Sequence, residues 1–290
     1  MSRISEALQY SDQAPRAALS SIECDTFIDA PSKTAAQQPT PAMAAPSPAA
    51  GGIECRQLPM RIEGTSPLLP FDDTHWYASE QYRIARTRIL QHPAQPKVIL
   101  VTSADSGDGK SVSAINLAGV MSLKSDATVV LADCDFRRSS LHKQLGLPDG
   151  PGLSEVLTGA CGLEQALIKT EQFPNLYVLT AGSSGKTVNP AELLDSPRWK
   201  ELSKRLRNTF RHVILDSPPF GRVADYDLLQ SSADGIVVVV RPDHTRRSVC
   251  LKMLDSIPRE RLLGVVLNCV EDWFLARPYH YKMADYRGDQ

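Results

Sequence analysis

Short apolar runs alternate with longer, partly polar segments between residues 97 and 268. The runs have strand length and are apolar throughout, which is typical of strands buried on both faces of a parallel sheet. They predict strands at 97–102, 128–132, 176–180, 212–216, 235–240 and 262–268. The segments between and before them predict helices at 75–91, 110–124, 190–208, 224–232 and 245–256. This order predicts an α/β fold, a doubly wound and mostly parallel sheet.

The ends of the chain have a different pattern. Residues 30–52 are rich in Pro, Ala, Ser, Thr and Gln and hold few large apolar side chains, so they cannot offset their ordering entropy. We therefore predict a Pro/Ala-rich disordered region at 1–72, a globular domain at 73–270 and a flexible tail at 271–290. The first ten residues could form a short docking helix, although a frayed end is the simpler interpretation.

Composition excludes several classes of function. The formal net charge of −1 gives no reason to expect a nucleic-acid partner. The six cysteines are scattered and form no C-x-x-C pair, so neither a zinc site nor disulfides are expected. No apolar run approaches the ~20 residues that a transmembrane helix needs. We expect a cytoplasmic protein, held at a membrane only through a partner.

A glycine-containing turn follows the first apolar run and ends in Gly109-Lys110-Ser111. Backbone N–H groups in such a turn, together with the start of the next helix, bind phosphates. In a P-loop the lysine reaches the β- and γ-phosphates and the hydroxyl binds Mg²⁺. The usual first glycine is replaced by Ala104, and a turn that binds nothing is the alternative. The predicted cofactor-binding residues are Ser106, Gly107, Asp108, Gly109, Lys110, Ser111 and Val112.

Acidic residues stand at the ends of two other predicted strands. Asp133 and Asp135 follow one strand, and Asp216 ends another. Because ligands bind at the carboxyl ends of strands in this fold, the three carboxylates should gather near the phosphate loop. We assign Asp216 and Asp135 to Mg²⁺ together with Ser111, and Asp133 to the acceptor hydroxyl. Arg137 is assigned to phosphate, and Lys110 and the three aspartates are the predicted catalytic residues.

These motifs resemble the bacterial tyrosine kinases (BY-kinases) that regulate capsule and exopolysaccharide export, which are relatives of the MinD/ParA ATPases. The resemblance runs from about residue 78 to 268. It rests on the phosphate loop at 104–111, the D-x-D-x-R motif ending at Arg137, and the D-[ST]-P-P motif starting at Asp216. Weaker similarities are the segments 152–159, 189–194 and 264–268. The resemblance implies an ATP- and Mg²⁺-dependent protein-tyrosine autokinase.

The helix before the loop carries Glu80-x-x-Arg83-x-x-Arg86, and side chains three apart share one helix face. A solvated face with an internal ion pair explains this pattern by itself. In the BY-kinases, however, an E-x-x-R-x-x-R helix at this place builds a ring-shaped oligomer. The resemblance therefore implies that Glu80, Arg83 and Arg86 form a subunit contact.

The tail holds Tyr279, Tyr281 and Tyr286 and lacks a core-like pattern. BY-kinases autophosphorylate a C-terminal tyrosine cluster in trans, although theirs is often denser. The resemblance implies these three tyrosines as acceptors. It also implies activation by a membrane adaptor of the polysaccharide co-polymerase type, which would hold the kinase at the inner membrane.

Two other functions remain open. One is a MinD/ParA-type ATPase switch, whose signature lysine follows the first glycine position of the loop. This chain has Asp105 there, which favours the kinase. The other is a nucleotide-binding scaffold with little catalysis, which would not need the tail tyrosines.

Overall fold

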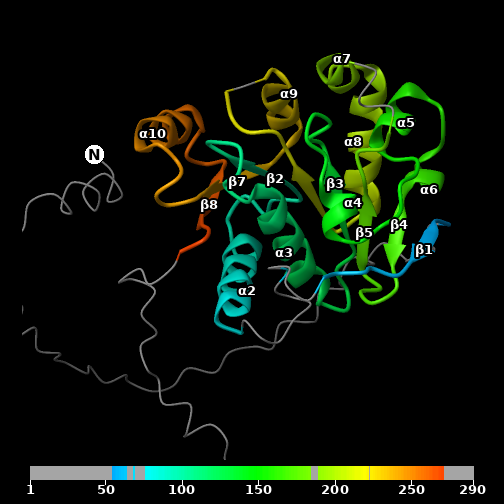
Figure 1. Ribbon diagram of the computed structural model, residues 1–290, viewed down its shortest axis with the longest axis horizontal. Helices are drawn as coiled ribbons and strands as arrows, with labels where there is room; N and C mark the ends of the chain where they lie inside the picture. The colour runs from blue at the N-terminus through cyan, green and yellow to red at the C-terminus, as the bar shows by residue number, and fades with distance from the viewer. Residues whose placement is uncertain (1–53, 64–67, 69–75, 184–188, 222, 271–290) are drawn as a thin grey trace, which may run out of the picture. The chain divides into compact units, whose positions relative to one another are not determined.

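The computed structural model describes residues 54–63, 68, 76–183, 189–221 and 223–270. Within these ranges eight strands form one sheet in the order β1-β4-β5-β3-β6-β2-β7-β8 (Figure 1). The strands are β1 (Arg56–Leu58), β2 (Val98–Ser103), β3 (Val129–Asp133), β4 (Ile168–Thr170), β5 (Leu176–Leu179), β6 (His212–Asp216), β7 (Gly235–Val240) and β8 (Leu262–Leu267). All neighbours are parallel except β4 and β5, so the predicted fold class is confirmed.

Helices cover both faces of this sheet. They are α2 (Trp76–Leu90), α3 (Lys110–Ser122), α4 (Leu141–Gln144), α5 (Leu153–Thr158), α6 (Leu163–Ala166), α7 (Pro190–Leu194), α8 (Pro197–Thr209), α9 (Asp225–Ser232) and α10 (Arg247–Ser256). Side chains of α2, α3 and α4 belong to the same core as Ile99 and Leu131, whereas those of α5 to α10 belong to the core that holds Leu100 and Val130. Because successive strand residues point to opposite faces, each strand contributes to both cores.

The structure differs from the predicted elements in several places, since the short helices α4, α5 and α6 and the strands β1 and β4 are not among them. The helix predicted at 190–208 is two helices, since Pro197 begins α8 and the Ser196 hydroxyl accepts the backbone N–H of Trp199 at 3.2 Å. The strand β1 pairs in parallel with β4 and lies before residue 73, so the sheet begins earlier than the predicted domain boundary. Both strands have three residues, too few for a periodic pattern to indicate them.

The central strand β2 lies at the topological switch point of the sheet. The chain passes from β2 through α3 to β3 on one side, whereas β7 and β8 lie on the other. In doubly wound sheets ligands bind at the carboxyl ends of the strands at such a point. None of the helices in the described ranges is long and apolar enough to cross a membrane.

Candidate active site

The loop that joins β2 to α3 has the backbone shape that its glycines predict. Gly107 and Gly109 adopt left-handed conformations, with φ of 94° and 88°. A Cβ on Gly109 would also lie 1.9 Å from Asn268 Nδ2, so a side chain is excluded on two grounds. The helix α3 begins at Lys110, and its first N–H groups have no partner within the helix. They are directed, with the positive end of the helix dipole, to where a phosphate would bind.

Ala104 occupies the position of the first glycine of the usual P-loop pattern, and its surroundings show why a glycine is not required there. Its side chain is buried in the core that β2 shares with α9, and its φ is not positive. A methyl group at this position therefore gains apolar contacts without steric strain. The departure from the standard spacing leaves the loop intact.

Asp108 holds the loop in place from inside. Its side chain is fully buried, and its carboxylate accepts the backbone N–H of Asp105 at 2.9 Å and the Thr245 hydroxyl at 2.7 Å. His244 Nδ1 lies 2.9 Å from the same carboxylate. Asn268, the residue after β8, donates from its side chain to the Asp108 carbonyl at 2.9 Å. Hydrogen bonds thus connect the loop to the segments that follow β7 and β8. The spacing of the sequence motifs does not identify His244 and Thr245 as partners of this loop.

Three carboxylates meet at the carboxyl ends of β3 and β6. Asp133 and Asp216 are direct partners in the register of these strands, and both are fully buried. Lys110 Nζ forms an ion pair with Asp135 Oδ2 at 2.8 Å, and both side chains are nearly buried. Neither carboxylate oxygen of Asp216 has a hydrogen bond of ordinary geometry among the described residues. Lys110 therefore pairs with Asp135 and lies near Asp216, whose carboxylate has no ion pair of its own among the described residues.

Burial dominates the electrostatics of this cluster. It raises the pKa of Asp216, and the charge of Lys110 opposes the rise. It also raises the pKa of Asp133, and the negative charge of Asp216 adds to that effect. Burial alone would lower the pKa of Lys110, but the charges of Asp216 and Asp135 outweigh it, so that pKa is raised. The cluster carries more negative charge than Lys110 can balance, which favours a bound cation.

Asp133 accepts hydrogen bonds from three backbone N–H groups that the sequence does not predict as its partners. One oxygen accepts the backbone N–H of Asp135 at 3.2 Å, and the other accepts those of Ser140 and Leu141 at 3.2 and 3.3 Å. These bonds fix the turn after β3 and the start of α4. Both oxygens of Asp133 are therefore engaged by the backbone.

The two arginines after this turn point to different partners. Arg137 forms a two-pronged ion pair with Asp225 at the start of α9, with Nε–Oδ2 at 2.9 Å and Nη2–Oδ1 at 3.3 Å. Arg138 instead donates from Nη1 to the Ser106 hydroxyl of the phosphate loop at 2.5 Å. The sequence assigned Arg137 to phosphate and left Arg138 unassigned. Adjacent arginines on one turn offer no sequence signal that distinguishes them.

The predicted subunit-contact residues lie on α2. Arg83 Nε and Glu80 Oε2 are 3.7 Å apart, and both side chains are about half exposed, at 49% and 52%. Arg86 Nη1 donates to the carbonyl of Val120 in α3 at 2.9 Å, so this side chain bonds within the same chain. The predicted acceptors Tyr279, Tyr281 and Tyr286 lie outside the described residues.

Comparison with known proteins identifies relatives along most of the described chain. Tyrosine-protein kinase YwqD of Bacillus subtilis is 37% identical over 194 residues, which span 66% of this chain and 80% of that protein. CpsD of Streptococcus pneumoniae serotype 4 is 31% identical over 197 residues, 66% of this chain and 84% of the relative. The kinase ptk of Acinetobacter johnsonii is 35% identical over 209 residues, 71% of this chain but 28% of that longer protein. No family model matches the chain.

Solved structures give the same result. The chimerical protein CapA2B2 is similar with a TM-score of 0.65 and 30% identity, over 72% of this chain and 92% of that one. The kinase domain of Escherichia coli tyrosine kinase ETK has a TM-score of 0.64 and 26% identity, over 76% and 90% of the two chains. The cell division ATPase MinD of Pyrococcus furiosus has a TM-score of 0.50 and 25% identity, over 59% and 71%. With this fold, these motifs and these relatives, the chain belongs to the bacterial tyrosine-protein kinases.

Proposed function

We propose that this chain is an ATP-dependent protein-tyrosine autokinase that regulates capsule or exopolysaccharide production. The observation that carries the proposal is the buried cluster of Lys110, Asp135 and Asp216 beside a phosphate loop at the switch point of the sheet. Phosphoryl transfer needs charge stabilisation and positioning more than covalent chemistry, and this cluster offers both. The names of its relatives supply the acceptor, a protein tyrosine.

Mg²⁺ fits the residues at this site. The oxygens of Asp216 are buried beside Lys110 and the Ser111 hydroxyl and could accept a cation, and Ser111 and Asp135 are the other candidate ligands. Among the described residues, no group of three or more His, Cys, Asp or Glu side chains could hold a metal by itself. That suits Mg²⁺, which usually takes one or two carboxylates and completes its shell with phosphate oxygens and water. When bound, Mg²⁺ would supply charge stabilisation to the transferring phosphoryl group.

The remaining side chains take supporting roles in this proposal. Lys110 leaves Asp135 in part to contact the β- and γ-phosphates, since an incoming polyphosphate competes for its ammonium group. Arg138, which already touches Ser106, contributes a second positive charge at the loop. Arg137 holds α9 through Asp225 rather than binding phosphate. Asp133 holds the turn through backbone bonds, so we do not retain it as the group that orients the acceptor hydroxyl.

The acceptor and partner follow from the family. We propose that Tyr279, Tyr281 and Tyr286 receive the phosphoryl group from a neighbouring subunit in a ring. The ring would use Glu80, Arg83 and Arg86. The kinase would work at the cytoplasmic face of the inner membrane with an adaptor of the chain-length regulator type. The chimerical CapA2B2 supports a two-protein arrangement in a related kinase.

A phosphotyrosine assay tests the proposal. The chain is incubated with ATP and Mg²⁺, with and without the cytoplasmic segment of the adaptor, and probed for phosphotyrosine and ATP hydrolysis. We expect adaptor-stimulated labelling that Lys110→Met abolishes and that deletion of residues 277–290 largely removes. ATP hydrolysis without labelling would reject the kinase and favour the ATPase switch. Labelling that persists in Lys110→Met would reject the phosphate-loop assignment.

A further inference from the structure

A buried carboxylate lies inside the phosphate loop. Asp108 stands directly before the Gly109-Lys110-Ser111 turn, and its side chain is fully buried. A loop that binds phosphates through its N–H groups gains nothing from a negative charge of its own, and a buried carboxylate without hydrogen-bond donors is costly. The donors that surround Asp108 therefore decide whether the loop can keep its shape.

The two oxygens of this carboxylate bond to different parts of the chain. Oδ2 accepts the backbone N–H of Asp105 at 2.9 Å, which closes the loop on itself. Oδ1 accepts the Thr245 hydroxyl at 2.7 Å and lies 2.9 Å from His244 Nδ1. These two partners are 137 and 136 residues farther along the chain, in the segment that follows β7. Asp108 is thus the link between the loop and that segment.

Residues 241–245 form a turn that presents both partners together. The backbone N–H groups of His244 and Thr245 both donate to the carbonyl of Arg241, at 3.2 and 2.9 Å. The Thr245 hydroxyl also accepts the backbone N–H of Arg241 at 3.0 Å, so it both donates and accepts a hydrogen bond. Asp243 has a left-handed φ of 62°, which is uncommon outside glycine. The turn therefore has a defined shape that does not depend on a ligand.

The imidazole of His244 also covers the loop from outside. Its Cε1 and Nε2 atoms lie 3.5 and 3.6 Å from the position that a Cβ on Gly107 would take. The side chain is 41% exposed, and no hydrogen bond to Nε2 is found in the part of the chain that the structure describes. His244 belongs to neither hydrophobic core. Removing this ring therefore takes a contact from the loop without leaving a cavity in a core.

The two glycines beside Asp108 explain why these contacts matter for binding. Gly107 and Gly109 both have left-handed conformations, which glycine adopts at no steric cost. Glycine also has the greatest conformational freedom, so this tripeptide is where the loop has the most entropy to lose when a ligand orders it. Contacts that fix the residue between the two glycines remove that cost in advance. The N–H groups of the loop then stay directed to the phosphates.

We propose that His244 and Thr245 are positioning residues for nucleotide binding, which act through Asp108 to hold the phosphate loop in its binding shape. This inference rests on the proposed nucleotide site and adds to it two residues from outside the loop. Loss of either side chain weakens nucleotide affinity, whereas Lys110 and Asp216 keep their places. The expected signature is a change in Kd and KM with little change in kcat.

Nucleotide titration of the full chain tests both residues. Binding of a fluorescent ATP analogue with Mg²⁺ gives Kd, and ATP hydrolysis gives kcat and KM. We expect His244→Ala and Thr245→Val each to raise Kd and KM about tenfold, with kcat changed less than about threefold. His244→Asn keeps an N–H donor near the position of Nδ1 and should restore much of the affinity. Unchanged Kd in either of the first two variants would overturn the assignment of that residue, and an equal loss in His244→Asn would overturn the role of Nδ1.

A double-mutant cycle tests whether His244 acts through Asp108. His244→Ala should cost less affinity in an Asp108→Asn chain than in wild type, because the carboxylate that it bonds is already lost. An equal loss in both backgrounds would show that His244 acts on the nucleotide directly and would overturn the positioning role. If thermal unfolding shows that Asp108→Asn is not folded, the comparison of His244→Asn with His244→Ala decides the question without a change at Asp108.

Ser248→Ala is the matched control. It removes an exposed hydroxyl at the start of α10, close in sequence to the turn, and should leave Kd unchanged. A loss equal to that of His244→Ala would show a general effect of changes in this segment and would overturn the assignment.

The same titration separates this proposal from the kinase assignment. Wild type that binds the analogue but forms no phosphotyrosine would reject the kinase, and a raised Kd in His244→Ala would still support the positioning role. Wild type that binds no nucleotide would reject the phosphate loop and this role of His244 with it. Equal Kd in wild type and in the variants would overturn the positioning role alone.

Discussion

Asp216 shows how one residue can oppose stability and serve function. It is fully buried at the end of β6, and its oxygens have no firm partner among the described residues. Burial raises its pKa, so the ionised carboxylate makes the folded state less stable at high pH than an ordinary aspartate would. Sites that bind cations often keep an unfavourable buried negative charge, because the bound cation neutralises it.

Asp216→Asn should therefore stabilise the ligand-free chain and abolish phosphoryl transfer. At pH 8 the neutral amide removes a buried charge, and we expect the free energy of unfolding to rise by about 1 to 2 kcal/mol. Urea unfolding and the phosphotyrosine assay measure the two effects. Asp149→Asn, at a side chain that is 94% exposed, is the control and should change neither. A destabilised Asp216→Asn chain would contradict the electrostatic account.

The adjacent arginines allow a sharp comparison. Arg138→Ala removes the contact with Ser106 and should lower kcat about tenfold or more with little change in stability, because the side chain is exposed. Arg137→Ala breaks the ion pair with buried Asp225 and should lower the free energy of unfolding by about 1 to 3 kcal/mol. Thermal unfolding and steady-state kinetics on both variants separate the roles. The reverse pattern would restore Arg137 as the phosphate ligand.

At the scale of elements, α2 packs on the core with one face and leaves charged side chains exposed on another. Tyr82 and Ile89 anchor it in the core, and the Tyr82 hydroxyl donates to Ser113 in α3 at 3.2 Å. Glu80 and Arg83 remain exposed, and an exposed pair three residues apart contributes only about 0.2 to 0.5 kcal/mol. Their charges are therefore available for contact with another subunit.

Arg83→Glu should prevent assembly without destabilising the monomer. Reversing this charge places repulsion in the proposed ring contact, while the unfolding free energy should change by less than about 0.5 kcal/mol. Analytical ultracentrifugation measures the assembly and thermal unfolding measures the stability. Arg88→Glu alters an exposed arginine on another side of the same helix and should leave assembly intact. Unchanged sedimentation of Arg83→Glu would argue against a ring built on α2.

At the scale of the whole molecule, folding is linked to pH through His212. Its pKa is about 4 in the folded chain and about 6.5 when unfolded, so the unfolded state binds more protons between these values. Neutral His212 therefore costs the folded state nothing above pH 6.5. As the pH drops from 6.5 toward 4, the free energy of unfolding falls by at most about 3 kcal/mol, because the unfolded chain takes up a proton on this side chain. The comparison is urea unfolding of wild type and His212→Asn in phosphate-free buffer. The difference in stability between them should shrink or reverse at low pH, and a constant difference would contradict the linkage.

The sequence by itself determined the fold class, the phosphate loop and the three aspartates at strand ends. These depend on local patterns. Buried strands are continuously apolar, and a loop that needs two glycines before Lys110 is typical of a phosphate-binding loop. The motifs also sufficed to identify the family. All three motifs stand at the carboxyl ends of strands, where ligands bind in a doubly wound sheet.

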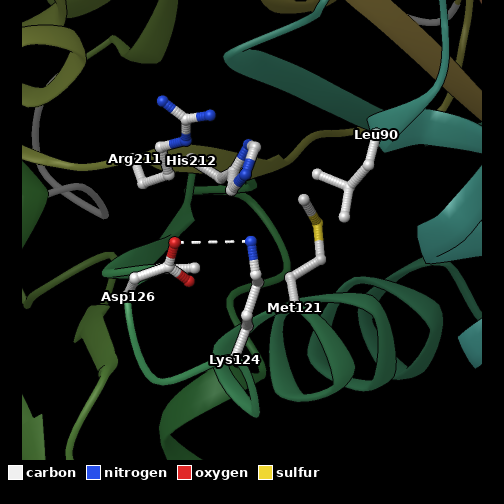
Figure 2. Close-up of a pocket in the computed structure, with 7 residues that line it drawn as sticks. Leu90, Met121, Lys124, Asp126, Arg211 and His212 are labelled. Atoms are coloured by element: carbon white, nitrogen blue, oxygen red, sulfur yellow. Dashed lines mark ion pairs between the residues drawn. The ribbon is translucent and has the colours of Figure 1, made fainter. Parts of the chain in front are cut away.

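Only the tertiary structure decided which partners these residues have. The pairing of β1 with β4, the hydrogen bonds from Thr245 and Asn268 to Asp108, and the different partners of Arg137 and Arg138 all join segments distant in sequence. So does the small hollow lined by Leu90, Met121 and His212, where the ends of α2 and α3 meet the start of β6 (Figure 2). Local patterns report which face of an element is apolar, but a polar side chain takes the partner that packing brings within about 3 Å. That choice is made by the assembled sheet.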